Sequence, residues 1–272
     1  MNSESEYFTC IKLEAAWVDG RILLLGGFMR IVLSESTTKA VENVASTVIE
    51  RIEANPAITI GLATGRTMEP VYASWVKVAK MLNLSHEKIF FFMLDEYLGL
   101  PEGHQGSFKS YMYKHLIYPL GLKDSQFAFP PVHTQPLEEA SKHYEQSIVE
   151  ASGIDLQLLG IGQNGHIGFN EPGSSRQSLT RVVELTYETR EANSGNFHGE
   201  NVPVRALSMG IGTIMNSKSL LMLATGKSKA DAIKYLVNHH DDPTCPATFL
   251  KSHPHFTLVL DPDAASKINL KI

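Results

Sequence analysis

The chain has 272 residues, and its 24 Lys or Arg against 29 Asp or Glu give a formal net charge of −5 at pH 7. This balance excludes an overall basic field for nucleic acid or an anionic membrane, so an anionic substrate would need local contacts. The 2 cysteines are too few for a disulfide framework, and the sequence predicts neither a membrane span nor a secretory signal. We expect a cytoplasmic protein.

Short apolar runs bounded by turn residues predict buried strands at residues 29–33, 57–63, 88–94, 155–161, 219–224 and 256–260. Amphipathic stretches between them predict helices at residues 36–54, 69–82, 107–120, 137–151 and 228–238. Because strands and helices alternate, we expect a single-domain, Rossmann-like, doubly wound α/β fold with a mainly parallel sheet and helices on both faces. Ligands of such sheets bind outside the carboxyl ends of the strands.

Residues 1–28 precede the first strand that fits this alternation. Two interpretations are open for them. They are either a genuine N-terminal extension that packs on the sheet or upstream sequence that results from a misassigned start. Residues 29–272 form the predicted functional domain in both cases.

The glycine-rich segment 160–173 follows a predicted strand and is the most informative part of the chain. It gathers Asn164, His166 and Glu171 between glycines. A neutral histidine with a carboxylate partner passes protons near neutral pH, while an asparagine can only position its neighbours through its amide. The alternative interpretation is a tight connection that carries an incidental histidine.

Two adjacent acids, Asp95 and Glu96, follow the wholly apolar run of the third predicted strand. A carboxylate at this place is partly desolvated, which raises its pKa and makes it a better acceptor of a proton from carbon. Asp95 is therefore the predicted base. Because neighbouring strand residues face opposite ways, Glu96 fits a structural hydrogen bond better.

Two turns between a strand and a helix predict an anion site. The first supplies amides, hydroxyls and a guanidinium from Thr64, Gly65, Arg66 and Thr67. It lacks the Walker A and dinucleotide glycine spacings, which disfavours a nucleotide. The alternative for this segment is an ordinary turn.

The second turn contains Lys227 and Lys229, and either lysine can reach a phosphate or be a solvated helix-start residue. Arg190, between two predicted elements, is a weaker candidate for a substrate contact. The sequence predicts no metal ligand set.

The motifs LATGRT, MLDEYLGLP, GIGQNGHIGFNEPGSS, ETREAN and TGKSKADAI together resemble the glucosamine-6-phosphate deaminase family, which is related to the 6-phosphogluconolactonases. The resemblance runs from about residue 29 to the C-terminus. Lactonases share the general fold and a GHxAS-like loop, but not the FNEP continuation. Galactosamine-6-phosphate isomerases are closer, since they share LDE, the NGH loop and a segment similar to residues 246–250.

The resemblance implies conversion of glucosamine 6-phosphate and water to fructose 6-phosphate and ammonia, without metal or organic cofactor. His166, held by Glu171, would help to open the sugar ring, and Asp95 would move the proton from C2 to C1. The phosphate-contacting positions of the family match Thr64, Gly65, Thr67 and Lys229. Members occur as monomers and as hexamers, so a monomer or a homo-oligomer is expected.

Three positions depart from the family pattern. Many members have an acid where this chain has Asn164, so the relay here works without that carboxylate. A phosphate-binding arginine is replaced by Gly195, and Arg66 stands where a small residue is usual. We hypothesise that Arg66 replaces the missing guanidinium from the opposite side of the phosphate.

The allosteric site of some deaminases is matched only in part. Ser174 and Arg181 fit it, but a lysine is replaced by Val183 and the usual C-terminal tail is missing. Three other functions stay open: a galactosamine-6-phosphate deaminase, a 6-phosphogluconolactonase and a sugar-phosphate sensor without catalysis.

Overall fold

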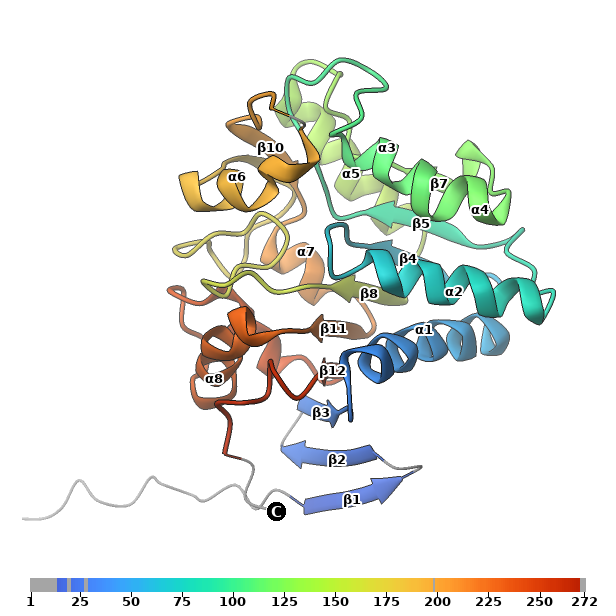
Figure 1. Ribbon diagram of the computed structural model, residues 1–272. Coiled ribbons are helices and arrows are strands. Elements are labelled where there is room, and N and C mark those ends of the chain that lie inside the picture. Colours follow the sequence, from blue (N-terminus) through green and yellow to red (C-terminus); the bar gives the residue numbers. More distant parts are fainter. Residues whose placement is uncertain (1–13, 19–20, 27–28, 198, 270–272) are drawn as a thin grey trace, which may run out of the picture.

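The computed structural model describes residues 14–18, 21–26, 29–197 and 199–269. In this part of the chain, one sheet has nine strands in the order β1-β2-β3-β12-β11-β8-β4-β5-β7 (Figure 1). From β3 to β7 all neighbours pair in parallel, whereas β1 and β2 form an antiparallel hairpin on β3. The strands are β1 (Glu14–Val18), β2 (Arg21–Gly26), β3 (Met29–Leu33), β4 (Thr59–Leu62), β5 (Phe90–Met93), β7 (Phe127–Ala128), β8 (Leu156–Leu159), β11 (Leu220–Ala224) and β12 (Phe256–Leu260).

All six predicted strands are confirmed, and the predicted bounds of β3 and β12 agree with the structure. The hairpin was not predicted. Its second strand extends the sheet because β2 pairs with β3. Whether residues 1–28 are an extension or a misassigned start stays a prediction, and residues 1–13, 19–20 and 27–28 lie outside the described residues.

Helices cover both faces of this sheet, as expected for a doubly wound α/β fold. In Figure 1, α1 and α2 lie in front of the strands, and the fainter α5 and α7 lie behind them. The helices are α1 (Thr37–Ala54), α2 (Glu69–Met81), α3 (Phe108–Met112), α4 (Tyr118–Leu120), α5 (Leu137–Glu150), α6 (Tyr187–Asn193), α7 (Ile211–Met215) and α8 (Ala230–Asn238). Shorter helical turns are η1 (Tyr113–Ile117), η2 (Asp124–Gln126), η3 (Ser194–Asn196), η4 (Lys227–Lys229) and η5 (Pro246–Ser252).

Helix α1 illustrates how the sequence determines these elements. The Ser36 side chain accepts a hydrogen bond from the Lys39 amide and caps the first turn. Residues at a spacing of three or four are buried along one face: Ala40, Val41, Val44, Ala45, Val48, Ile49 and Ile52. This apolar stripe packs on the sheet, and the polar positions between its members remain in water.

The predicted helix at residues 107–120 is wrong in detail, because it is divided into α3, the π-helical turn η1 and α4. Pro119 lacks an amide hydrogen and clashes with the carbonyl four residues earlier, so regular α-helix cannot continue there. The chain instead makes a wider turn, in which the Tyr118 amide donates to the Tyr113 carbonyl.

A second sheet was not predicted. In the described part of the chain it has three antiparallel strands in the order β6 (Asp95–Tyr97), β10 (Arg205–Ser208) and β9 (Arg181–Glu184). Side chains of this sheet contribute to a small apolar cluster that includes Tyr97, Phe108, Phe169 and Phe197. Strand β6 begins two residues after β5 ends, so the chain passes from one sheet to the other at Asp95.

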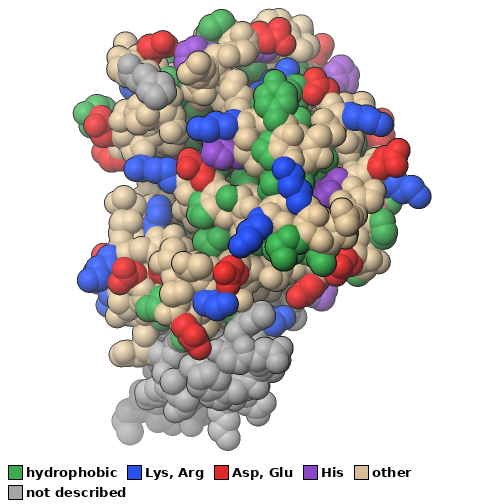
Figure 2. Space-filling view, turned by 45° about the vertical axis from the view of Figure 1, so that its right-hand side comes forward, with side chains coloured by type: hydrophobic (Ala, Val, Ile, Leu, Met, Phe, Trp, Pro, Cys, Tyr) green, Lys and Arg blue, Asp and Glu red, His purple; other side chains and the backbone are tan. Residues whose placement is uncertain are grey.

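The charges on the molecule agree with the absence of a strongly basic composition. Lys and Arg side chains are interspersed with Asp and Glu over the face shown in Figure 2. Among the described residues, every helix is too short or too polar to cross a membrane.

Candidate active site

The loops that carry the predicted site follow neighbouring strands of the large sheet. The order β11-β8-β4-β5 places the loop after β8 between the loop after β11 and the loop after β4. These strands are parallel, so their carboxyl ends lie at the same edge of the sheet. Four sequence motifs far apart along the chain therefore converge at one edge.

Asp95 is buried at this edge, with 5% of its surface exposed. Its Oδ1 atom has no hydrogen-bond partner among the described residues. Burial, together with the neighbouring charge of Glu96, raises the pKa of Asp95 to about 8. Such a carboxyl group exchanges a proton near neutral pH, as a general base must.

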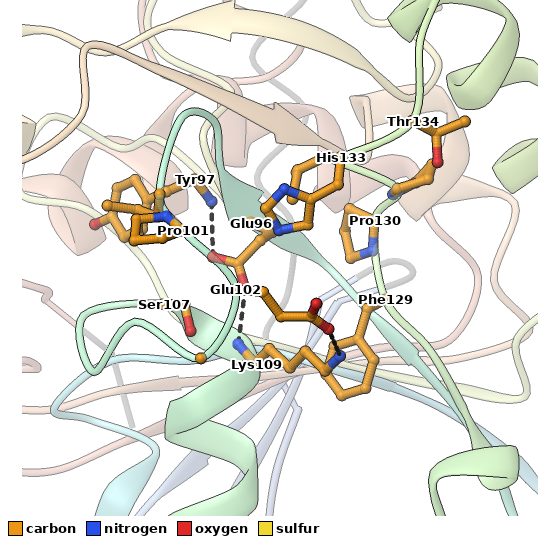
Figure 3. A pocket seen from close by; sticks show the side chains of 14 residues that line it. Glu96, Tyr97, Pro101, Glu102, Ser107, Lys109, Phe129, Pro130, His133 and Thr134 are labelled. Atoms are coloured by element: carbon orange, nitrogen blue, oxygen red, sulfur yellow. Dashed lines mark hydrogen bonds and ion pairs between the residues drawn. The ribbon is translucent and has the colours of Figure 1, made fainter.

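Glu96 makes structural hydrogen bonds, as the sequence predicted. Its carboxylate accepts hydrogen bonds from the amides of Tyr97 at 2.8 Å, Phe108 at 3.0 Å and Lys109 at 2.7 Å. Figure 3 shows this group in a cavity of about 230 Å³, which neither Asp95 nor His166 lines. Glu96 therefore fixes the start of α3, and this cavity is separate from the predicted catalytic residues.

The loop after β8 brings His166, Asn164 and Glu171 together. His166 Nδ1 lies 2.7 Å from Asn164 Oδ1 and 3.5 Å from Glu171 Oε2, and Asn164 Nδ2 donates to the same Glu171 oxygen at 2.9 Å. Two acceptors around Nδ1 assign the proton of the neutral ring to that nitrogen, which leaves Nε2 as its basic atom. The arrangement suits a proton relay.

The Glu171 carboxylate is strongly stabilised in its ionised form. Burial acts to raise its pKa, but hydrogen bonds from His166, Thr189 and Asn164 and the charge of His166 outweigh this and hold the pKa at about 2. Glu171 therefore orients the imidazole as a fixed anion over the whole range of pH near neutrality.

Two glycines allow this loop to fold closely. A side chain at Gly162 would overlap the His166 ring, whose nearest atom lies 2.2 Å from the ideal Cβ position. Gly165 has φ +82°, and its ideal Cβ would lie 2.2 Å from Cys245 Sγ. Both positions thus require glycine for the imidazole to be placed as it is.

The same loop packs beside Asp95. The Phe169 amide donates to Ser208 Oγ at 3.2 Å, and Ser208 is the ladder partner of Asp95 in the small sheet. Gly168 lies against the side chains of Leu94 and Ser208. The predicted base and the predicted relay are thereby held on adjacent pieces of backbone.

The turn after β4 has the features of an anion site. Gly65 has φ +98°, and within the described part of the chain the amides of Thr64, Gly65 and Thr67 donate to no other residue. The Tyr111 hydroxyl donates to the Gly65 carbonyl at 2.9 Å and so fixes the turn. These amides precede the 13-residue helix α2, whose N-terminus favours negative charge.

Two cations lie near this turn. Arg66 Nη2 donates to the Ala192 carbonyl at 3.0 Å, which places its guanidinium beside the segment that contains Gly195. Burial lowers the pKa of Lys229, and the charge of Arg66 lowers it further. Neither cation forms an ion pair with an acid in the part of the chain that the structure describes, so the two together favour an anion at this place.

The other candidate cations are placed differently. Lys227 is exposed, which agrees with its solvated interpretation. Arg190 Nε donates to the Val202 carbonyl at 3.2 Å, and its contact with a substrate stays a prediction. In the described residues, no group of three or more His, Cys, Asp or Glu side chains has a geometry that would hold a metal ion.

The family model of glucosamine-6-phosphate isomerases and 6-phosphogluconolactonases matches residues 33–259. The chain belongs to this family. A glucosamine-6-phosphate deaminase of Shouchella clausii is 42% identical over 239 residues, which are 88% of this chain and 97% of that protein. A glucosamine-6-phosphate deaminase of Rhodopirellula baltica is 44% identical over 227 residues, or 83% of this chain and 90% of that protein.

Solved structures of this isomerase and lactonase family share the fold. A monomeric glucosamine-6-phosphate deaminase superposes with a TM-score of 0.84 at 36% identity, covering 88% of this chain and 99% of that chain. The 6-phosphogluconolactonase of Trypanosoma brucei superposes with a TM-score of 0.69 at 19% identity, covering 88% and 98%. At that identity the likeness shows the fold alone.

Sequence reasoning missed the side chains that support the family motifs. Thr186 and Thr189 donate hydrogen bonds to Glu171 Oε1. Ser208 and Tyr111 hold the two loops described above. These residues lie between 15 and 46 positions from their partners, and no spacing in the sequence indicates such contacts.

Proposed function

We propose that this chain is a glucosamine-6-phosphate deaminase, an enzyme that converts glucosamine 6-phosphate and water to fructose 6-phosphate and ammonia. The placement of Asp95 carries the proposal: it is a buried carboxyl group beside the His166 loop, and its Oδ1 atom has no hydrogen-bond partner among the described residues. The deaminases to which the chain is 42% and 44% identical support the same reaction.

Ring opening is the first step of the proposed reaction. His166, with its proton on Nδ1 held by Asn164 and Glu171, presents Nε2 as the atom that takes a proton from the anomeric hydroxyl and returns one to the ring oxygen. The C1–O5 bond breaks and the open-chain aldehyde forms. Glu171 stabilises the imidazolium that exists between the two transfers.

Isomerisation and loss of ammonia follow. Asp95 takes the proton from C2 and delivers it to C1, so that an enolamine forms and becomes the C2 imine. Water adds to C2, the C2–N bond breaks, and ammonia leaves with the proton that the water supplied. The product is the 2-ketose phosphate, and no electrons enter or leave the site.

The substrate phosphate would bind at the turn after β4. The amides of Thr64, Gly65 and Thr67, the N-terminus of α2, Arg66 and Lys229 together offer donors and positive charge. Arg66 would thus fill the electrostatic role left open by Gly195. Arg66 belongs to the phosphate turn itself, and its guanidinium contacts the segment of Gly195 by donating to the Ala192 carbonyl.

The test is a direct assay of both products. Purified protein is incubated with glucosamine 6-phosphate, and ammonia and fructose 6-phosphate are measured in equal amounts if the proposal is right. Galactosamine 6-phosphate in a parallel assay determines the preferred C4 configuration. In heavy water, exchange of the proton held by Asp95 with solvent would place deuterium at C1 of the product. Hydrolysis of 6-phosphogluconolactone without release of ammonia from glucosamine 6-phosphate would refute the proposal in favour of a lactonase.

We also propose that the chain is a monomer, because the solved deaminase that is 36% identical to it is monomeric. Light scattering during gel filtration measures the mass directly. A mass of about 30 kDa, as for one chain of 30.1 kDa, supports the proposal, and a multiple of this value refutes it.

A further inference from the structure

Helix α6 contacts both halves of the candidate site. At its first turn, the Thr189 hydroxyl donates a hydrogen bond to Glu171 Oε1. At its last turn, the Ala192 carbonyl accepts the bond from Arg66. We propose that α6 links the phosphate end of the site to the acid–base end, and that Thr189 is a positioning residue that acts on the reaction through Glu171.

The hydrogen bonds around Glu171 give Thr189 this role. Oε2 accepts from Asn164 and faces His166, so it belongs to the relay, whereas Oε1 accepts from Thr189 and, at 3.4 Å, from Thr186. Both oxygens of the carboxylate are therefore held by hydrogen bonds. Removing the Thr189 donor leaves the long contact alone on Oε1 and frees the group to rotate away from the imidazole.

Burial makes this hydrogen bond matter. Thr189 is 4% exposed, and in the described part of the chain its hydroxyl donates to Glu171 alone. A hydrogen bond to a charged group is stronger than one between neutral groups, and water does not readily replace it at a buried site. In the described part of the chain, the titratable and charged groups around Glu171 are His166 on its own loop and Arg181 and Glu184, which line the same cavity as Glu171.

Hydrogen bonds at both ends make α6 a short, firmly held link between the two contacts. It has 7 residues, its N-terminus is capped by Thr186, and Asn193 bonds back to the Thr189 carbonyl at 2.8 Å. Arg66 has two competing acceptors, the Ala192 carbonyl and the proposed phosphate. A substrate that engages Arg66 therefore changes the contact at the last turn of the helix that positions Glu171.

Thr189→Val tests the positioning role, with Thr189→Ser as the conservative variant. The inference rests on the proposed function, so the assay is deamination of glucosamine 6-phosphate. We expect Thr189→Val to lower kcat roughly tenfold with little change in KM, because a displaced Glu171 no longer holds the imidazole in place. Thr189→Ser should restore most of kcat.

Thr213→Val is the matched control. Thr213 is also buried, and its hydroxyl donates a hydrogen bond of 2.6 Å to another carboxylate, that of Glu145, outside the candidate site. It should lower thermal stability with little change in kcat. If Thr189→Val and Thr213→Val lower kcat equally, or if Thr189→Ser fails to restore it, the positioning role is wrong. Carbon-13 NMR of the Glu171 carboxyl group, which should protonate at higher pH in Thr189→Val, tests this role without turnover and thus separately from the proposed function.

A double-mutant cycle between Arg66→Ala and Thr189→Val tests the link itself. Two independent effects on kcat/KM would multiply in the double variant. We expect the double variant to lose less than that product, because Arg66→Ala already releases the last turn of α6. A loss equal to the product would overturn the link.

Discussion

Asp95 and Glu96 are adjacent carboxylates with opposite surroundings. Glu96 accepts hydrogen bonds from three backbone amides, while Asp95 Oδ1 is buried without a hydrogen-bond partner in the described part of the chain. The first arrangement stabilises the backbone at the start of α3. The second leaves a carboxyl group able to take a proton from a substrate.

Asp95→Asn should therefore abolish turnover while the protein stays folded. Asparagine has the same shape but cannot accept the C2 proton, so kcat should fall by about 10²- to 10⁴-fold. The measurement is ammonia release at saturating substrate, with circular dichroism as the check on folding. Activity within threefold or so of the wild type would mean that another group is the base.

Glu96→Gln should show the opposite division of effects. A neutral amide accepts the amide hydrogen bonds of Tyr97, Phe108 and Lys109 more weakly than a carboxylate does. We expect a loss of about 1–3 kcal/mol in the free energy of unfolding and a smaller effect on kcat than Asp95→Asn has. Urea titration and the same ammonia assay measure both. The contrast fails if Glu96→Gln is the more damaging change to kcat.

The pKa of Asp95 predicts how activity depends on pH. Because this pKa is raised to about 8, most of the free protein carries the protonated, inactive acid at neutral pH. The value of kcat/KM should therefore rise with pH and level off above about 8. A profile that is flat from about pH 6 to pH 9 would contradict the assignment of Asp95 as base.

The same shift has a consequence for stability. A carboxyl group whose folded pKa lies above its ordinary value of 3.8 favours the folded state when protonated, so that stability is lost as pH rises towards about 8. Asp95→Asn does not ionise and avoids this loss. Within this window, the free energy of unfolding of Asp95→Asn minus that of the wild type should increase by up to about 1.4 kcal/mol for each pH unit. Urea titrations at about pH 5, 7 and 9 test the trend.

The fold could be predicted where elements are long and apolar. The six predicted strands and four of the five predicted helices repeat a simple pattern, and β3 and β12 agree to the residue. The small sheet escaped prediction because β6 and β9 are short and β9, Arg181–Glu184, is half-exposed, so neither carries a clear alternation. Pairing with β10, far along the chain, determines them instead.

The candidate site divides in the same way. Groups within one motif, such as His166 and Glu171, are recognisable because glycines and a strand surround them. The partner of Glu171 on α6 is not, since threonine is common and the contact forms only when two loops pack. Arg66 lies between these cases, because its motif predicts an anion site but its bond to Ala192 is visible only in the structure.

Arg66→Ala should weaken binding of the phosphorylated substrate. Loss of a charge-assisted contact to phosphate should raise KM roughly tenfold to a hundredfold, and Arg66→Lys should recover part of the loss. Unphosphorylated glucosamine is the control, since its poor turnover should not depend on Arg66. An unchanged KM for glucosamine 6-phosphate in Arg66→Ala would refute the phosphate role.

Gly165→Ala should displace the loop that carries His166. The new methyl group would enter the space of Cys245 Sγ, and φ +82° is unfavourable for alanine, so we expect about 1–3 kcal/mol of lost stability together with reduced kcat. Adding Cys245→Ala separates the two causes, because it removes the overlap but leaves the backbone strain. The double variant should recover part of the stability and of kcat. If Gly165→Ala alone matched the wild type in both measurements, the close packing of this loop against the segment before η5 would not determine the position of His166.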